Sequence, residues 1–376
     1  MLKQKGLMIM FFLVFFLIYF IGNVYIIFRI ARDLNLHGLS FYIFFAVYIA
    51  AAVFSFWAMK FSRENSASEF AAVISKAGYI WLGVFSISIA YFLLSHILFI
   101  FNHSQKFMFN TTLVTIILIV ISSVYSVINT CGVPRVKEVE INVKHLPVDK
   151  FTIVQLSDIH IDVSTKYDDI KKIVDITNSL NPDIIAFTGD LADINIAKTY
   201  KEYGLADLKA KYGVVAINGN HEYYTGVGLY EYVCNSLDWK LLNNENILID
   251  DKFYFAGITD IKTSTYFNNK KADVDKAMNG INFEKPVIFM SHQPQIFSEV
   301  YKKYPITLQL SGHTHAGQIP PFDMIEYFIY KYFWGLYKEN YNGKESYIYV
   351  TPGTRWWGPP MRLISKNEIT KITLRR

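Results

Sequence analysis

The sequence predicts an α/β domain that follows an all-α bundle of four membrane-spanning helices. Three observations lead to this prediction: four long uncharged stretches early in the chain, an abrupt change of composition near residue 133, and a later alternation of short apolar runs with amphipathic segments. Hydrophobic residues make up 52% of the chain, which is high for a purely soluble protein. We therefore expect a membrane domain at residues 1–133 and a second domain at residues 134–376.

The uncharged stretches contain no Asp, Glu, Lys or Arg, and each has about the 20 residues that a helix needs to cross a bilayer. The first one follows Lys3 and Lys5, as in a signal peptide, but its apolar run is too long and no small-residue cleavage site follows promptly. We therefore expect four transmembrane helices, at residues 7–28, 40–59, 77–101 and 108–130.

The charges between these stretches predict the orientation of the chain. Basic residues concentrate in cytoplasmic loops. With the N-terminus inside, the outer loops contain only Arg29, Arg32 and Lys106. The inner segments contain eight basic residues, namely Lys3, Lys5, Lys60, Arg63, Lys76, Arg135, Lys137 and Lys144. We expect a multi-pass protein of the cell membrane whose second domain lies in the cytoplasm.

Charge and cysteine content exclude other classes of protein. The net charge of +5 is small for this length and falls partly on the residues that flank the membrane stretches, so it gives no support to nucleic-acid binding. Cys131 and Cys234 are the only cysteines. Neither a disulfide framework nor a thiolate metal site is indicated by two cysteines so placed.

The second domain begins after Gly132 and Pro134, which end the fourth apolar stretch. Short runs of β-branched and aromatic residues then end in polar clusters, as expected for buried strands; they cover residues 151–158, 183–190, 213–220, 286–292 and 306–313. Amphipathic patterns such as residues 166–180 lie between them, which predicts an α/β sheet. Ligands of such sheets bind beyond the carboxyl ends of the strands.

The ends of these runs collect side chains that bind metals. Five of the six histidines of the second domain occupy them, and only His145 does not. The full set is Asp158, His160, Asp190, Asn220, His221, His292, His313 and His315. Carboxylate, imidazole and amide ligands together suit Mn²⁺, Fe²⁺ or Zn²⁺. So many ligands exceed the needs of one tetrahedral ion and fit two ions that share a bridging carboxylate.

The ordered motifs D-x-H, G-D, G-N-H-E, H and G-H-x-H resemble those of the calcineurin-like metallophosphoesterases, over residues 138–376. The stretches GNHEYY, GHTHAGQ and GLYKENYNGKESYIYVTPGTRWWGPPMRL resemble the branch of membrane-associated phosphohydrolases related to the phosphodiesterases YaeI and YkuE. Residues 351–357 read TPGTRWW where that branch has a basic, glycine-rich turn. The resemblance implies a four-layer α/β/β/α sandwich.

The resemblance also implies a role for each candidate residue. One divalent ion would be held by Asp158, His160 and His315. The second would be held by Asn220, His292 and His313, with Asp190 bridging the two ions. A water or hydroxide between the ions would attack phosphorus.

Beside the ligands, His221 would stabilise the developing charge or protonate the leaving oxygen. Asn220 and His221 are candidates for substrate binding, as are Arg355 and Arg362, which could clamp a phosphate. For each arginine, structural pairing or contact with the membrane surface is an open alternative.

The sequence thus predicts a membrane-anchored phosphohydrolase with two divalent metal ions that cleaves a phosphodiester or pyrophosphate bond. The aromatic-rich segment 319–337 is either an interfacial segment or a buried loop. The interfacial interpretation favours a lipid-linked substrate, such as a nucleotide-sugar lipid. A broad-specificity phosphodiesterase with soluble substrates is the main alternative, and a transporter or a non-catalytic scaffold with the same domain is a further one.

Overall fold

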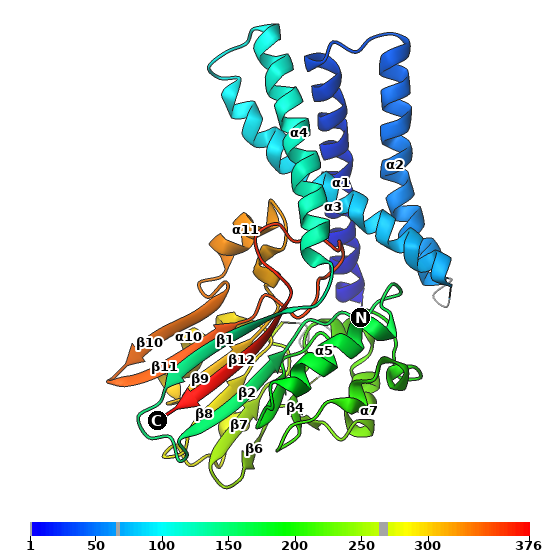
Figure 1. Cartoon of the computed structure of the whole chain (residues 1–376). Coiled ribbons are helices and arrows are strands. Elements are labelled where there is room, and N and C mark those ends of the chain that lie inside the picture. Colours follow the sequence, from blue (N-terminus) through cyan, green and yellow to red (C-terminus); the bar gives the residue numbers. More distant parts are fainter. Residues whose placement is uncertain (1, 65–67, 263–269) are drawn as a thin grey trace. The chain divides into compact units, whose positions relative to one another are not determined.

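The computed structural model describes residues 2–64, 68–262 and 270–376 (Figure 1). The chain forms two compact units. The first comprises Met1–Cys131, Gln318–Met324 and Gly358–Ile364, and the second comprises Gly132–Gly317, Ile325–Trp357 and Ser365–Arg376. The sequence predicts one domain boundary, near residue 133. That prediction does not foresee that Gln318–Met324 and Gly358–Ile364 belong to the first unit. Those segments are too short to carry the length and hydropathy that mark a membrane helix.

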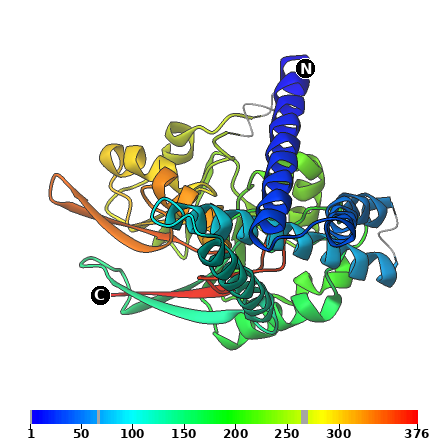
Figure 2. The ribbon, with the colours of Figure 1, turned by 90° about the horizontal axis from the view of Figure 1, so that it is seen from above.

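Four helices build most of the first unit, and all are long and apolar enough to cross a membrane (Figures 1 and 2). They are α1 (Leu2–Asp33), α2 (Leu39–Glu64), α3 (Glu69–Leu98) and α4 (Gln105–Thr130). The expected number of helices is confirmed, but each helix extends beyond at least one end of its uncharged stretch. The prediction that Arg29 and Arg32 lie in an outer loop is wrong, because both belong to the last turns of α1.

A buried ion pair explains why α1 continues past Phe28. The side chains of Arg29 and Asp33 are 3% and 0% exposed, and Arg29 Nε contacts Asp33 Oδ2 one turn along the helix. The hydroxyl of Thr112 in α4 donates to Asp33 Oδ2 at 2.6 Å. Arg29 Nη1 lies 2.7 Å from His96 Nδ1 in α3. This network of Arg29, Asp33, Thr112 and His96, the clamp, therefore joins three helices, although the buried Arg29 Nη2 has no hydrogen-bond partner among the described residues.

The two later segments of the first unit pack among these helices. The hydroxyl of Ser86 in α3 donates to the carbonyl of Pro320 at 2.6 Å. Thr130 at the end of α4 donates in the same way to the carbonyl of Pro360 at 2.8 Å. Ile319 and Met361 are buried in an apolar cluster whose other members include Ile26, Ile87 and Ile119. Each segment is therefore part of the membrane unit through both hydrogen bonds and apolar contact.

The second unit contains two six-stranded mixed sheets. The first has the order β1 (Arg135–Asn142), β12 (Glu368–Arg375), β2 (Lys150–Leu156), β3 (Ile184–Phe187), β4 (Val214–Ala216) and β5 (Lys240–Leu241). The second has the order β10 (Gly335–Tyr341), β11 (Lys344–Val350), β9 (Leu308–Ser311), β8 (Val287–Met290), β7 (Phe253–Gly257) and β6 (Glu245–Ile249). All five predicted strand runs form strands: β2, β3 and β4 are parallel neighbours in one sheet, and β8 and β9 in the other.

Three apolar cores separate four layers. Between the sheets, residues such as Ile153 and Ile288 interdigitate. One outer core places α5 (Tyr167–Ser179) and α7 (Val227–Ser236) on the first sheet, and the other places α9 (Val274–Met278) and α10 (Phe297–Lys303) on the second. Shorter helices are α6 (His221–Thr225) and α11 (Phe322–Ile329). The predicted α/β/β/α sandwich after an all-α bundle is confirmed.

Candidate metal centre

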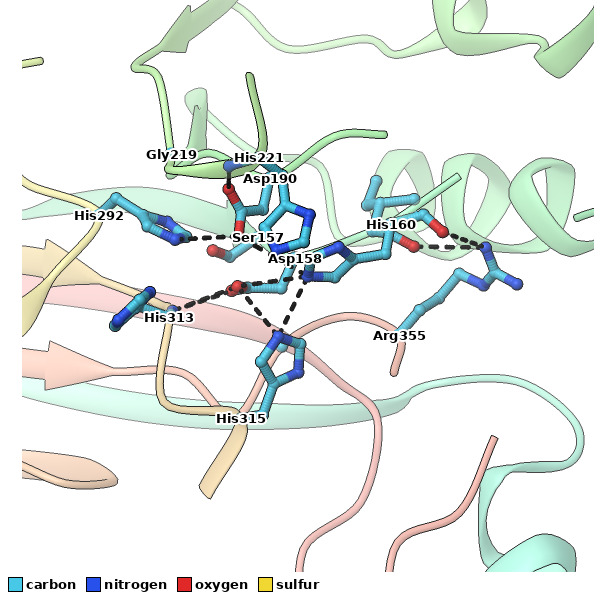
Figure 3. Close-up of polar contacts among 12 residues, drawn as sticks. Ser157, Asp158, His160, Asp190, Gly219, His221, His292, His313, His315 and Arg355 are labelled. Atoms are coloured by element: carbon cyan, nitrogen blue, oxygen red, sulfur yellow. Dashed lines mark hydrogen bonds and ion pairs between the residues drawn. The ribbon is translucent and has the colours of Figure 1, made fainter. Parts of the chain in front are cut away.

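All eight candidate side chains lie in the segments that directly follow β2, β3, β4, β8 and β9. His221 is the first residue of α6, and His315 begins a short 3-10 helix. Figure 3 labels seven of the eight, all but Asn220. Asp158 and His160 follow β2, Asp190 follows β3, and Asn220 and His221 follow β4. His292 follows β8, and His313 and His315 follow β9. The parallel strands of each sheet bring their carboxyl ends to one edge, so residues up to 157 positions apart in the chain meet there.

The backbone is unusual where it presents these side chains. Five of the seven predicted metal ligands have positive φ angles between 48° and 74°, namely Asp158, His160, Asp190, His313 and His315. Residues other than glycine rarely adopt this left-handed region, and such strain concentrates at functional sites. Regular strand geometry would turn neighbouring side chains to opposite faces. The left-handed residues instead direct ligands two positions apart toward a common centre.

Two glycines let the loops approach the carboxylates closely. A Cβ atom at Gly219 would lie 2.1 Å from Asp190 Oδ1, and one at Gly312 would lie 2.3 Å from Asp158 Oδ2. No side chain could be accommodated at these distances without moving the carboxylate. Gly219 and Gly312, the glycines of the G-N-H-E and G-H-x-H motifs, thus leave the space that the two carboxylates occupy, in addition to allowing the turn.

Asp158, His160 and His315 form the first group, and their potential ligand atoms all lie within 4.8 Å of one another. His315 Nε2 lies 3.4 Å from Asp158 Oδ1 and 3.1 Å from His160 Nε2. The other ring nitrogen of His160, Nδ1, lies 2.8 Å from Asp193 Oδ1. A carboxylate at Nδ1 fixes the tautomer that leaves Nε2 available for a metal ion.

The second group contains Asp158, Asp190 and His292, again with ligand atoms within 4.8 Å. His292 Nδ1 donates to the carbonyl of Thr188 at 2.7 Å, which leaves Nε2 facing Asp190 Oδ2 at 3.1 Å. The predicted ligands Asn220 and His313 lie together, with His313 Nδ1 2.9 Å from Asn220 Oδ1.

The electrostatics of the centre favour bound cations. Asp158 and Asp190 are almost completely buried, and burial together with the Asp190 charge raises the pKa of Asp158. Burial opposes the ionisation of Asp190 too, but His292 and His221 hold the pKa of Asp190 well below its usual range. Burial would lower the pKa of His292, yet the carboxylates of Asp190 and Asp158 raise it to about 10. Clustered buried carboxylates with imidazoles and an amide oxygen fit divalent metal ions.

His221 is held beside this centre by an acidic side chain. Its Nδ1 lies 2.7 Å from Asp193 Oδ1, so Asp193 contacts both His160 and His221. Burial would lower the pKa of His221, but Asp190 and Asp193 raise it to about 9. On the other side, the ring of Trp357 lies 5.6 Å from the ring of His221, and its side chain is exposed. His221 can therefore carry a proton next to an accessible aromatic surface.

The glutamate of the G-N-H-E motif organises the loops and does not face the ligands. Its carboxylate, Glu222, accepts backbone N–H groups from Asp190, Leu191 and Gly219 at 3.0, 2.8 and 2.6 Å. These bonds join the loop after β3 to the loop after β4. Burial raises the pKa of Glu222 to about 7.

The two arginines considered for substrate binding are both buried, and Arg355 contacts the backbone of the segment that carries Asp158 and His160 (Figure 3). Arg355 is 3% exposed, and its Nη1 donates to the hydroxyl of Thr165 at 2.8 Å and to the carbonyl of Ile159 at 3.3 Å. Arg362 is fully buried in the first unit, where its backbone N–H donates to the carbonyl of Ser126. The side-chain contacts of Arg355 with Thr165 and the Ile159 carbonyl favour structural pairing, while the substrate-binding role of either arginine stays a prediction.

Tyr330 is a residue that sequence reasoning missed. Its hydroxyl lies 3.1 Å from His313 Nε2, the ring nitrogen that does not face Asn220. Tyr330 follows α11 in the aromatic-rich segment, where no motif distinguishes it from its neighbours. Only the path of the chain after the last predicted ligand could have identified it.

Comparison with known proteins identifies the class of protein to which this fold and site belong. Residues 151–317 match the family model described as calcineurin-like phosphoesterase. An Aquifex aeolicus protein described as a metallophosphoesterase is 30% identical over 247 residues, which are 64% of this chain and 92% of that protein. The chain therefore belongs to the calcineurin-like metallophosphoesterase family.

Two further relatives place it within the family. A Danio rerio "transmembrane protein with metallophosphoesterase domain" is 34% identical over 281 residues, which are 71% of this chain and 63% of the relative. The chain thus spans less than two thirds of that relative's length. Bacillus subtilis YkuE is 28% identical over 247 residues, which are 60% of this chain and 80% of that protein. Together with the four apolar helices, the first of these relatives identifies a membrane protein.

Proposed function

We propose that this protein is a multi-pass membrane phosphohydrolase that uses two divalent metal ions to cleave a phosphodiester or pyrophosphate bond. The observation that supports it most strongly is the gathering of Asp158, Asp190 and four histidines in three overlapping groups. Two of these groups share Asp158, and the third joins His160, Asp190 and His221. The excess of basic residues in the inner segments that flank the apolar stretches supports a catalytic domain on the cytoplasmic side of the cell membrane.

In this proposal, the two ions are Mn²⁺, Fe²⁺ or Zn²⁺. Asp158, His160 and His315 would hold one ion, and Asn220, His292 and His313 would hold the other, with Asp190 available to both. When bound, such ions would neutralise phosphate charge and lower the pKa of an attacking water molecule. Asp193 and the Thr188 carbonyl orient the histidine rings through their Nδ1 atoms, which fixes where the ions and the substrate phosphate are held.

His221 is the proton donor to the leaving oxygen in this mechanism. Its contact with Asp193 and its raised pKa of about 9 keep it protonated at neutral pH. A positioned acid of this kind contributes about 10²–10⁴-fold to a rate. Asn220 and His221 together contact the substrate phosphate, while the buried contacts of Arg355 and Arg362 favour structural roles.

A lipid-linked substrate is the form of this proposal that the chain path favours. Only Ala316 and Gly317 separate His315 from Gln318, the first residue of a membrane-unit segment. Likewise, Trp357, whose ring contacts His221, directly precedes Gly358 and the other such segment. The loops that carry these residues are therefore continuous with segments packed among the apolar helices. A phosphodiesterase with soluble substrates lacks this supporting observation and is the alternative.

The test compares substrates on the purified full-length protein, with elemental analysis of the same preparation. We expect metal-dependent hydrolysis of bis-p-nitrophenyl phosphate and a higher kcat/KM for a detergent-dispersed lipid pyrophosphate. The variant Asp190→Ala serves as the control for contaminating phosphatases. Equal kcat/KM for the lipid and for a water-soluble analogue with the same headgroup would reject the lipid-linked form of the proposal. No metal-dependent turnover of any phosphate ester would reject the proposal altogether.

A further inference from the structure

The helix α11 reverses the usual arrangement of a surface helix. A helix on a water-soluble domain turns its apolar face inward and its polar face to solvent. In α11 no side chain is buried, and its six large apolar or aromatic residues are 46–81% exposed, namely Phe322, Met324, Ile325, Tyr327, Phe328 and Ile329. An exposed apolar face of this size marks a surface that has an apolar neighbour.

The opposite side of the same helix is polar and half-buried. Asp323, Glu326 and Tyr330 follow one another at spacings of three and four residues, which places them on one face. Glu326 Oε2 is buried and has no hydrogen-bond partner among the residues that the structure describes. Tyr330 reaches the ring of His313. Within the second unit, the side that carries Glu326 and Tyr330 therefore includes a contact with the candidate ligand His313, while the large apolar side chains of α11 are exposed.

The chain just before α11 indicates what covers the apolar face. Ile319 is buried in the apolar cluster of the membrane helices, and Pro320 accepts a hydrogen bond from Ser86 of α3. The first residue of α11, Phe322, follows two positions later, and the segment Gln318–Met324 belongs to the membrane unit. A helix that starts from a bundle surrounded by lipid has lipid as its nearest apolar solvent, and Phe, Tyr and Ile are common on the buried face of interfacial helices.

We propose that the outer face of α11 lies among lipid acyl chains at the membrane surface and that Tyr330, on its inner face, is a positioning residue for the metal ligand His313. Asn220 Oδ1 can only accept a hydrogen bond, so in this structure Nδ1 of His313 donates to it and Nε2 accepts from the Tyr330 hydroxyl. If Nδ1 held a metal ion instead, Nε2 would carry the proton and donate to the Tyr330 oxygen, so the tyrosine can orient the ring in both states. The same helix thus connects contact with the lipid surface to the orientation of one metal ligand. Only the role of His313 as a ligand rests on the proposed function.

The lipid contact is tested on the full-length protein in vesicles of phosphatidylethanolamine and phosphatidylglycerol. A nitroxide is attached at Phe328→Cys in a Cys131→Ser background; the remaining Cys234 is fully buried. The matched control is Tyr341→Cys, an exposed aromatic at the end of β10. We expect the label at position 328 to be accessible to oxygen and protected from a water-soluble nickel chelate, and the label at position 341 to show the reverse. A label at position 328 accessible to nickel would reject lipid contact, and one shielded from both reagents would indicate a protein partner instead.

The coupling to the site is tested by Tyr330→Phe, which removes only the hydroxyl. Loss of such a hydrogen bond to a metal-bound histidine weakens metal affinity by about 10–100-fold. We expect that loss in competition titrations with a chelator, while the melting temperature of the metal-free protein and the nitroxide accessibility at position 328 do not change. Tyr341→Phe is the control and should bind metal normally. Unchanged metal affinity in Tyr330→Phe would reject the positioning role, and neither this result nor the labelling depends on finding a hydrolysed substrate.

Discussion

The two units bury charged side chains in different ways. In the membrane unit, Arg29 and Asp33 form an ion pair, and Thr112 and His96 contact the same two side chains, although Arg29 Nη2 has no hydrogen-bond partner among the described residues. In the catalytic unit, Asp158 and Asp190 are equally buried, but their carboxylate oxygens lie among imidazole nitrogens that converge on the same place. The charges of the first arrangement pair with each other, whereas the second presents converging ligand atoms that fit bound cations. Buried charged side chains that pair with each other therefore indicate a structural role, and buried side chains whose ligand atoms converge indicate a ligand site.

The sharpest test of this contrast removes one carboxylate from the converging group. Asp190→Ala deletes the residue proposed to hold both ions, and we expect hydrolysis to fall below detection in steady-state assays. The melting temperature of the metal-free protein should fall, because Asp190 balances the protonated ring of His292 and accepts the backbone N–H of His221 at 2.9 Å. Turnover within a few-fold of the original protein would show that Asp190 holds no catalytic ion.

The proton donor provides a somewhat smaller effect. His221→Ala should lower kcat by about 10²–10⁴-fold for substrates with alkoxide leaving groups. The loss should be much smaller for p-nitrophenyl esters, because p-nitrophenolate leaves without being protonated. His145→Ala is a suitable control, since His145 is an exposed histidine of the same domain outside the site. An equal loss for both leaving groups would mean that His221 acts in binding and not as an acid.

Substitutions in the clamp should lower the free energy of unfolding and leave the catalytic rate unchanged. Asp33→Ala leaves the Arg29 guanidinium buried without its counter-ion, which typically costs about 3–5 kcal/mol. The double variant Arg29→Ala/Asp33→Ala should cost less, because no uncompensated charge remains. Unfolding of the detergent-solubilised protein measures both. If the double variant were the less stable of the two, the clamp would contribute more than charge compensation.

The metal centre should release protons when it is loaded. In the metal-free protein the pKa of His292 is raised to about 10, so the ring is protonated at pH 7.5 and must lose its proton before Nε2 can bind an ion. We expect apparent metal affinity to rise between pH 7 and pH 10. Calorimetric titration in two buffers of different ionisation enthalpy measures the protons released. Identical binding enthalpies in both buffers would contradict a protonated His292.

The strands and the clustering of the candidate metal ligands could be predicted from the sequence, because both depend on local patterns. Each buried run that ends in Asp, Asn or His forms a strand, and the strand order then brings those ends together. Asp193 could be noticed only as an acidic residue near a ligand; its contact with both His160 and His221 depends on loop geometry. The role of its two contacts stays a prediction until variants are measured.

Other features could not be found because they depend on pairing between distant segments. The uncharged-stretch rule ended the first helix at Phe28, since an Arg and an Asp are costly in a membrane unless each finds the other one turn away. The segments that hold Pro320 and Pro360 have no pattern of their own and are defined by hydrogen bonds from Ser86 and Thr130. Tyr330 could not be predicted either, because its role depends on a contact with His313 and not on a local pattern.

The return of Gln318–Met324 and Gly358–Ile364 to the helix bundle has a consequence for biosynthesis. All four helices have been translated by residue 130, but Ile319 and Met361, which complete their apolar cluster, are made much later. The bundle cannot reach its final packing in the translocation machinery before nearly the whole catalytic domain has left the ribosome. Maturation of the membrane unit and folding of the catalytic domain therefore finish together, and a chain cut after residue 133 would leave each half without surface that the other normally supplies.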